Sequence, residues 1–213
     1  MGGRAGGGAS GGMGKGSRGV GDASMRHLSA AAQKTLRAEE EAIRRQRVEY
    51  GMVMDENGNV IWKGTDNHSG RIVFRTNLEN KIVTHNHPPQ ISQKNMADRA
   101  DGGGSFSKTD LMTAANANVS EMRAVIGRYS FSIRRPKTGW HKGGWEGDKF
   151  YNNNAYAYKK AKATVDKRVK EYYKSAGGKG SSAGRRVSST YWHLVNKEYA
   201  KIQGYTYTKT KVN

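Results

Sequence analysis

The sequence contains no cysteine and too few apolar residues for a large hydrophobic core. The absence of cysteine excludes disulfides, thiolate catalysis and cysteine-based zinc fingers, and it fits a reducing, cytoplasmic location. Apolar residues make up only 35% of the 213 residues, so part of the chain is expected to stay unpacked. No apolar run reaches the length of a signal-peptide core or a membrane span, so no membrane association is expected.

Basic charge is what the chain has in excess, with a formal net charge of +19. The charge is uneven, because residues 136–213 hold 17 Lys and Arg against 5 Asp and Glu, whereas residues 49–135 carry only +2. Such a surplus attracts nucleic-acid phosphates or acidic partners, although a soluble pair of basic helices has the same composition. We therefore divide the chain into a Gly-rich tail (1–22), a core with an N-terminal helix (23–135) and a basic helical extension (136–213).

Hydrophobic periodicity and turn signals predict an α/β core of about six strands with helices on its faces. The helix predictions cover 23–48, 107–119, 156–174 and 186–203, with a Gly/Ser linker over 177–184. The strand predictions cover 49–55, 59–63, 71–75, 81–84, 122–126 and 129–133, with a terminal edge strand over 205–211. In the first helix, the acidic run Glu39–Glu41 pairs with Arg44 and Arg45 on a face expected to be solvated.

The sequence Lys81-Ile-Val-Thr-His-Asn-His-Pro-Pro89 places two histidines at the end of a short strand. Because side chains alternate along a strand, His85 and His87 lie on one face and Asn86 on the other. Pro88 has no N–H to continue the ladder, so the strand ends there and both imidazoles face open space. Two imidazoles on one face form half of a zinc site.

A carboxylate is needed to complete such a site, and Asp110 is the best candidate. The segment Ser107-Lys-Thr-Asp110 precedes an apolar stretch and is typical of a helix start, with Ser107 as N-cap and Asp110 as the third helical residue. The same pattern is also explained by a cap alone, with the histidines as exposed turn residues. Asp98 and Asp101 compete with Asp110 for the role of third ligand.

These residues resemble the JAMM (MPN-type, JAB-like) zinc metalloprotease superfamily, whose pattern is an upstream Glu, then H-x-H-P, then S-x-x-D. The His-Asn-His-Pro sequence is most similar to the RadC branch, and the superfamily includes prokaryotic and phage-encoded members. The resemblance spans roughly residues 48–135 and implies a JAMM-like, cytidine-deaminase-like core of mixed strands. The chain departs from the pattern because Ser107 follows His87 by 20 residues, a longer spacing than the family's.

The resemblance also implies residue roles. Zn²⁺ is expected on His85, His87 and Asp110, with Glu49 as general base and Ser107 as oxyanion donor. Glu56 is the rival base, but it lies at a predicted turn tip. The implied reaction is hydrolysis of a peptide or isopeptide bond in a protein or peptide substrate.

Two other interpretations stay open in the sequence. The first is a basic nucleic-acid-binding or structural protein that keeps an inactive JAMM-like fold. The second is a nuclease, suggested only by the letters H-N-H, which such nucleases do not place contiguously. The insertion over 89–104 is expected to be a flexible loop or lid. Trp140, His141, Trp145 and Tyr151 cluster in a Gly-rich loop, where His141 is an outside candidate for the site.

Overall fold

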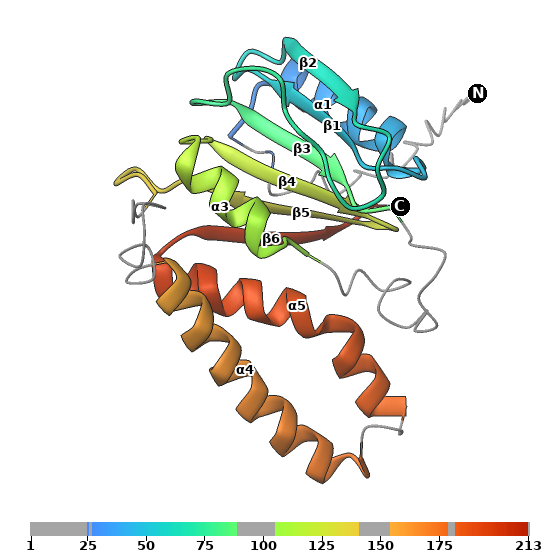
Figure 1. Ribbon diagram of the computed structural model, residues 1–213, viewed down its shortest axis with the longest axis vertical. Coiled ribbons are helices and arrows are strands. Elements are labelled where there is room, and N and C mark those ends of the chain that lie inside the picture. Colours follow the sequence, from blue (N-terminus) through green and yellow to red (C-terminus); the bar gives the residue numbers. More distant parts are fainter. Residues whose placement is uncertain (1–24, 26, 89–104, 141–153, 179–181, 213) are drawn as a thin grey trace, which may run out of the picture.

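The computed structural model describes residue 25 and the ranges 27–88, 105–140, 154–178 and 182–212. Six strands form one mixed sheet in the order β2-β1-β3-β4-β5-β6 (Figure 1). The strands are β1 (Tyr50–Met54), β2 (Val60–Thr65), β3 (Ile82–Asn86), β4 (Glu121–Ile126), β5 (Tyr129–Arg134) and β6 (Thr206–Lys211). Within this sheet only β3 and β4 run parallel. The predicted mixed sheet of about six strands flanked by helices is confirmed.

Helices cover both faces of the sheet (Figure 1). Helix α1 (Ala30–Arg44) packs on one face, where Leu36 joins a buried cluster with Met52 of β1. Helix α3 (Lys108–Asn116) packs on the other, where Leu111 joins a larger cluster with Val53. Adjacent residues of β1 thus point to opposite faces, as strand alternation requires. Both sides of the central strands are therefore removed from water.

Helix α1 is shorter than the predicted 23–48, because the Ser29 side chain accepts a hydrogen bond from the backbone N–H of Ala32 and caps it. Glu41 pairs with Arg44 and Arg45, as predicted. The prediction that Glu40 lies on the solvated face is wrong, since it is only 2% exposed. Its carboxylate points into the protein.

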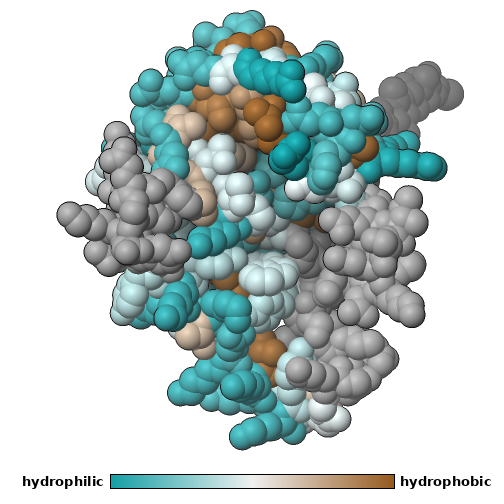
Figure 2. Space-filling view, in the orientation of Figure 1, coloured by the Kyte–Doolittle hydropathy of each residue, from teal (hydrophilic) through white to brown (hydrophobic). Residues whose placement is uncertain are grey.

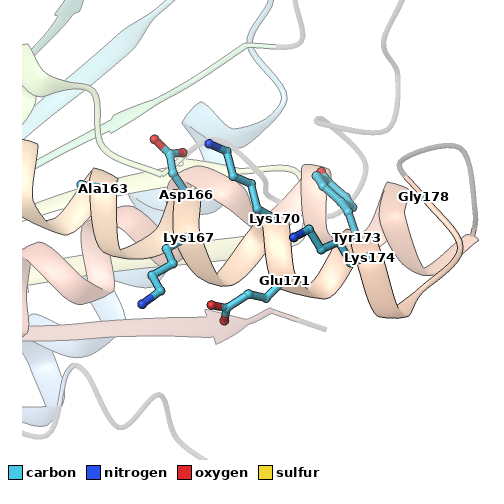
Figure 3. Close-up of a pocket in the computed structure, with 8 residues that line it drawn as sticks. All are labelled: Ala163, Asp166, Lys167, Lys170, Glu171, Tyr173, Lys174 and Gly178. Carbon is cyan, nitrogen blue, oxygen red and sulfur yellow. The ribbon is translucent and has the colours of Figure 1, made fainter.

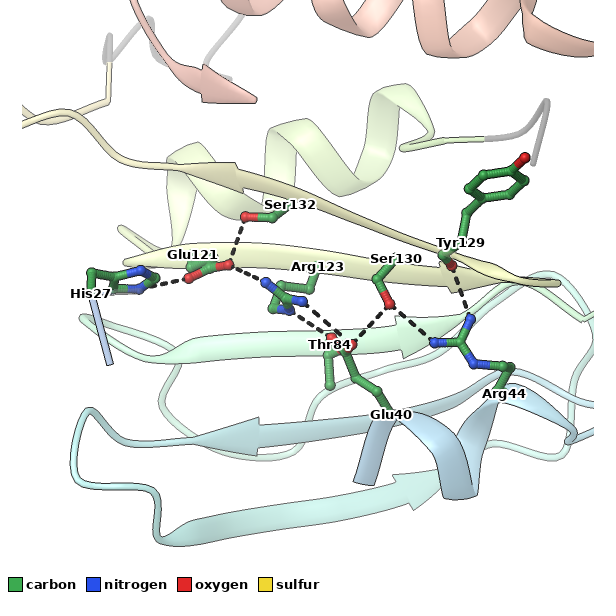
Figure 4. Close-up of polar contacts among 9 residues, drawn as sticks. All are labelled: His27, Glu40, Arg44, Thr84, Glu121, Arg123, Tyr129, Ser130 and Ser132. Carbon is green, nitrogen blue, oxygen red and sulfur yellow. Dashed lines mark hydrogen bonds and ion pairs between the residues drawn. The ribbon is translucent and has the colours of Figure 1, made fainter. Parts of the chain in front are cut away.

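Glu40 belongs to a buried ionic network between α1 and the sheet (Figure 4). Arg123 of β4 lies between two carboxylates, with its Nε 2.6 Å from Glu40 and its Nη1 2.6 Å from Glu121. The hydroxyl of Ser130 donates to Glu40, and His27 Nε2 lies 2.9 Å from Glu121. A buried cation with two hydrogen-bonded anions is satisfied, but losing one partner leaves an uncompensated charge.

Residues 71–75 do not form the predicted strand. The backbone N–H of Val73 donates to the Asp66 carboxylate rather than to a neighbouring strand. Ile72 and Phe74 pack over Gly51, where an added Cβ would lie 2.6–2.7 Å from their side chains. The alternating sequence is therefore explained by packing across the sheet face and not by a ladder.

The C-terminal part contributes both helices and a strand. Strand β6 pairs antiparallel with β5 at the edge of the sheet, which confirms the predicted terminal edge strand. Helices α4 (Asn154–Ser175) and α5 (Ser182–Gln203) form a hairpin on the side of the molecule away from β2 (Figure 1). Buried Trp140 donates its Nε1–H to the Val119 carbonyl at 2.6 Å and so closes the edge of the core. None of the helices in the described ranges has the length and apolarity needed to cross a membrane.

Candidate metal centre

The two histidines lie where β3 ends in the middle of the sheet. His85 is opposite Gly51 of β1 and Ala124 of β4, and it is 1% exposed. The backbone N–H of His87 donates to the Val125 carbonyl, which extends the parallel register one step past the strand. Because both neighbours of β3 hold its backbone, both imidazoles are fixed on the α3 side.

Asp110 reaches the histidines from the first turn of α3. The connection β3–α3–β4 is a crossover between parallel strands, so the carboxyl end of β3 meets the start of α3. Ligand sites in α/β sheets commonly form at this place. Ser107 accepts a hydrogen bond from the Asp110 N–H, and one Asp110 carboxylate oxygen accepts from the Ser107 N–H at 2.7 Å. This capping box fixes the rotamer that directs the carboxylate toward the imidazoles.

The three side chains are close enough together to share a metal ion. His85 Nε2 lies 2.8 Å from His87 Nε2 and 3.3 Å from Asp110 Oδ1, and His87 Nε2 lies 3.5 Å from Asp110 Oδ2. Ligand atoms about 2.1 Å from a tetrahedral ion lie about 3.4 Å from one another. The described residues thus bring together His85, His87 and Asp110 as a group that can hold a metal ion.

The electrostatics of the site favour an ionised Asp110. Burial alone would raise the pKa of Asp110, but His85 and His87 outweigh it and hold this pKa well below its usual value. Burial alone would lower the pKa of His85, but the carboxylates of Asp110 and Glu49 raise it above its usual value. The carboxylates of Asp110 and Glu49 thus place negative charge around the two imidazoles. The same negative charge favours the binding of a cation.

Glu49 lies beside the three candidate ligands, and the group of residues close enough to share an ion does not include it. Burial is the main reason why its pKa is raised, while His85 and His87 oppose that rise and Asp110 adds to it. The rival Glu56 is exposed in the β1–β2 turn, beyond the far end of β1. Because Met54 pairs with Ile82 and Gly51 with His85, that turn is at the opposite end of the strands from the histidines.

The backbone around Glu49 is held from several directions. Its N–H donates to the His68 carbonyl, and its own carbonyl accepts from the Thr65 hydroxyl. The Asn86 side chain accepts from the Tyr50 N–H at 2.6 Å and donates to the carbonyl of Val48 at 3.1 Å. The middle residue of the His-Asn-His sequence is thus hydrogen-bonded to the backbone of the residues on both sides of Glu49.

A cleft of about 760 Å³ opens beside the cluster. Its lining includes Glu49, His87, Ser107 and Asp110, together with the segment 69–74. Phe74 provides an apolar wall, with its ring 6.5 Å from that of His85 in an edge-to-face arrangement. Figure 2 shows hydrophobic surface on the upper part of this face, where β2 and the following segment lie in Figure 1. A substrate in the cleft would meet polar groups on one side and apolar side chains on the other.

Comparison with protein-family models, curated proteins and solved structures found no match.

Sequence reasoning missed two parts of the site. The segment 69–74 was not expected to line the cleft, because its alternating sequence is typical of a strand. The hydrogen bonds of Asn86 to the backbone beside Glu49 were not expected either, because the sequence predicted only the face on which Asn86 lies. The competing ligands Asp98 and Asp101, the insertion 89–104 and His141 lie outside the described residues.

Proposed function

We propose that the protein is a zinc-dependent hydrolase that cleaves peptide or isopeptide bonds. The convergence of His85, His87 and Asp110 beside Glu49 carries this proposal. Two imidazoles and one carboxylate are a donor set typical of catalytic zinc, because three protein ligands leave one position open. The resemblance to JAMM metalloproteases supports the same roles.

The chemistry divides among the residues at the cleft. Zinc on these three ligands would supply a Lewis acid and lower the pKa of a water to about 7. Glu49 is the base that takes the proton of the attacking water and returns it to the leaving amine as the C–N bond breaks. Its partial burial and raised pKa suit a group that must both accept and release a proton near neutral pH.

Ser107 supplies the third function. Its hydroxyl oxygen accepts from the Asp110 N–H, and the hydroxyl proton can still be donated into the cleft that Ser107 lines. That donation would stabilise the oxyanion of the tetrahedral intermediate, a contribution of about 3 kcal/mol in well-studied hydrolases. The apolar wall at Phe74 limits water around the developing charge and strengthens such a hydrogen bond.

The test is hydrolysis by the zinc-loaded protein of two fluorescence-quenched substrate sets, linear peptides and peptides joined through a lysine ε-amine. We expect cleavage that a chelator abolishes and zinc restores. Glu49→Gln should lose at least about 100-fold in kcat, a typical loss for a general base, while keeping its zinc. The matched control Glu56→Gln should cleave normally. Activity that survives Glu49→Gln but is lost in Glu56→Gln would show that the base is misassigned.

A further inference from the structure

Helix α4 carries a row of lysines on the face turned away from α5. Ala157, Ala161 and Val165 are buried, and they mark the packed face. The exposed residues on the opposite side, by the 3.6-residue helical period, are Lys159, Lys160, Lys167, Lys170 and Lys174. We call these five residues the lysine face. They span about 22 Å at 1.5 Å per residue.

The lysine face carries a surplus of positive charge over the two carboxylates beside it, Asp166 and Glu171. Within the described residues, none of its five ammonium groups lies within ion-pair distance of a carboxylate. The other cations of α4 are paired, Lys162 with Asp166 and Arg168 with Glu198. Asp166 is engaged further by the Tyr191 hydroxyl at 2.5 Å. Asp166 is thus already engaged by Lys162 and Tyr191, which leaves Glu171 as the other carboxylate beside the lysines in the hollow.

The lysines of this face project to both sides of the helix. Figure 3 shows Lys170 extending to one side of α4, where Asp166 also lies, and Lys167 extending to the other side, near Glu171. These residues line a shallow hollow along the helix. Lysines that reach to both sides of a helix about 10–12 Å wide can meet the phosphates at both edges of a duplex major groove, which is about 12 Å wide.

We propose that the lysine face of α4 binds the phosphate backbone of duplex nucleic acid independently of sequence. A protein partner fits less well, because protein interfaces centre on clustered apolar anchors, whereas Tyr156, Ala163 and Tyr173 are spread among the charges of this face. A membrane surface also fits less well, because an interfacial helix needs a free apolar face and that of α4 is packed on α5. This inference does not depend on the metal site.

The experiment measures binding of a fluorescent 20-base-pair duplex of mixed sequence by anisotropy from 50 to 200 mM salt. The test variant replaces all five lysines of the lysine face by Gln. The matched control removes the same charge from the exposed residues Lys34, Arg37, Lys63, Lys137 and Lys211. Circular dichroism melting verifies that both variants fold. Vesicles containing phosphatidylserine are a second probe.

We expect the lysine-face variant to bind at least tenfold more weakly at 100 mM salt. Each lost phosphate contact reduces the slope of log K against log salt by about 0.9, so the loss of five contacts should make the slope shallower by about 4.5. The control should change the slope by less than about 1. Equal losses in both variants, or no duplex binding by the wild type at 50 mM salt, would overturn the proposal. Tighter, lysine-dependent binding to vesicles than to duplex would overturn it as well.

Discussion

Asn86 accepts a hydrogen bond from the backbone N–H of Tyr50 at 2.6 Å and thereby fixes the residue that follows Glu49. The two histidines that flank Asn86 point to the opposite face of the sheet, toward Asp110. One tripeptide thus orients two candidate metal ligands and, through its middle residue, the proposed base beside them. The spacing between Glu49 and the two histidines is set by this single strand end.

Replacing Asn86 should therefore impair catalysis without removing the metal. Asn86→Ala frees the backbone groups of Val48 and Tyr50, and we expect kcat to fall at least tenfold because Glu49 loses its position. The measurement is steady-state kinetics together with zinc content. Asn57→Ala, in the exposed turn, is the matched control. Loss of zinc in Asn86→Ala would show that Asn86 supports the ligands and not the base.

The burial of Glu49 should cost the metal-free protein stability at neutral pH. The pKa of Glu49 is higher in the folded state than in the unfolded state, so the carboxyl group ionises less readily when the protein is folded. The free energy of unfolding therefore decreases as the pH rises through the folded-state pKa. Glu49→Gln should thus be more stable than wild type at pH 7 in the absence of metal. The difference should vanish below about pH 4, where the carboxyl is protonated in both states. Urea unfolding at both pH values measures this, with Glu56→Gln as control. A wild type more stable than Glu49→Gln at pH 7 would contradict the assignment.

Arg123 should be among the most sensitive positions for folding. Arg123→Met leaves the carboxylates of Glu40 and Glu121 buried without their cation, which typically costs about 3–5 kcal/mol. Arg45→Met removes an exposed partner of Glu41 and should cost less than about 0.5 kcal/mol. Urea denaturation of the two variants compares these costs. Equal costs would mean that the Arg123 network contributes no more than a surface pair.

The insertion after Pro89 offers a test of the ligand set. Deleting residues 90–102 removes both Asp98 and Asp101, and we expect the zinc content to be unchanged. Hydrolysis of large protein substrates should change far more than hydrolysis of short peptides if the insertion is a lid. Loss of zinc on this deletion, combined with retained zinc in Asp110→Ala, would show that Asp98 or Asp101 is the third ligand in place of Asp110.

Much of the site was predictable because its signals are local. Strand alternation predicts the orientation of His85 and His87, and a capping box predicts the position of Asp110. The Glu40–Arg123 pair was not predictable, because its partners are 83 positions apart and a Glu among charged neighbours is typical of a solvated face. Similarly, residues 71–75 alternate like a strand. Only the structure shows that Ile72 and Phe74 pack on the sheet over Gly51, where the missing side chain leaves space for them.

The most direct test is the zinc content of the purified protein, measured by mass spectrometry of the metal after dialysis against a weak chelator. The wild type should hold one zinc per chain. His85→Ala and Asp110→Ala should each retain less than about a tenth of that amount, whereas the exposed control His68→Ala should keep it all. Absence of zinc from the wild type after loading, or full zinc in both ligand variants, would contradict the central claim.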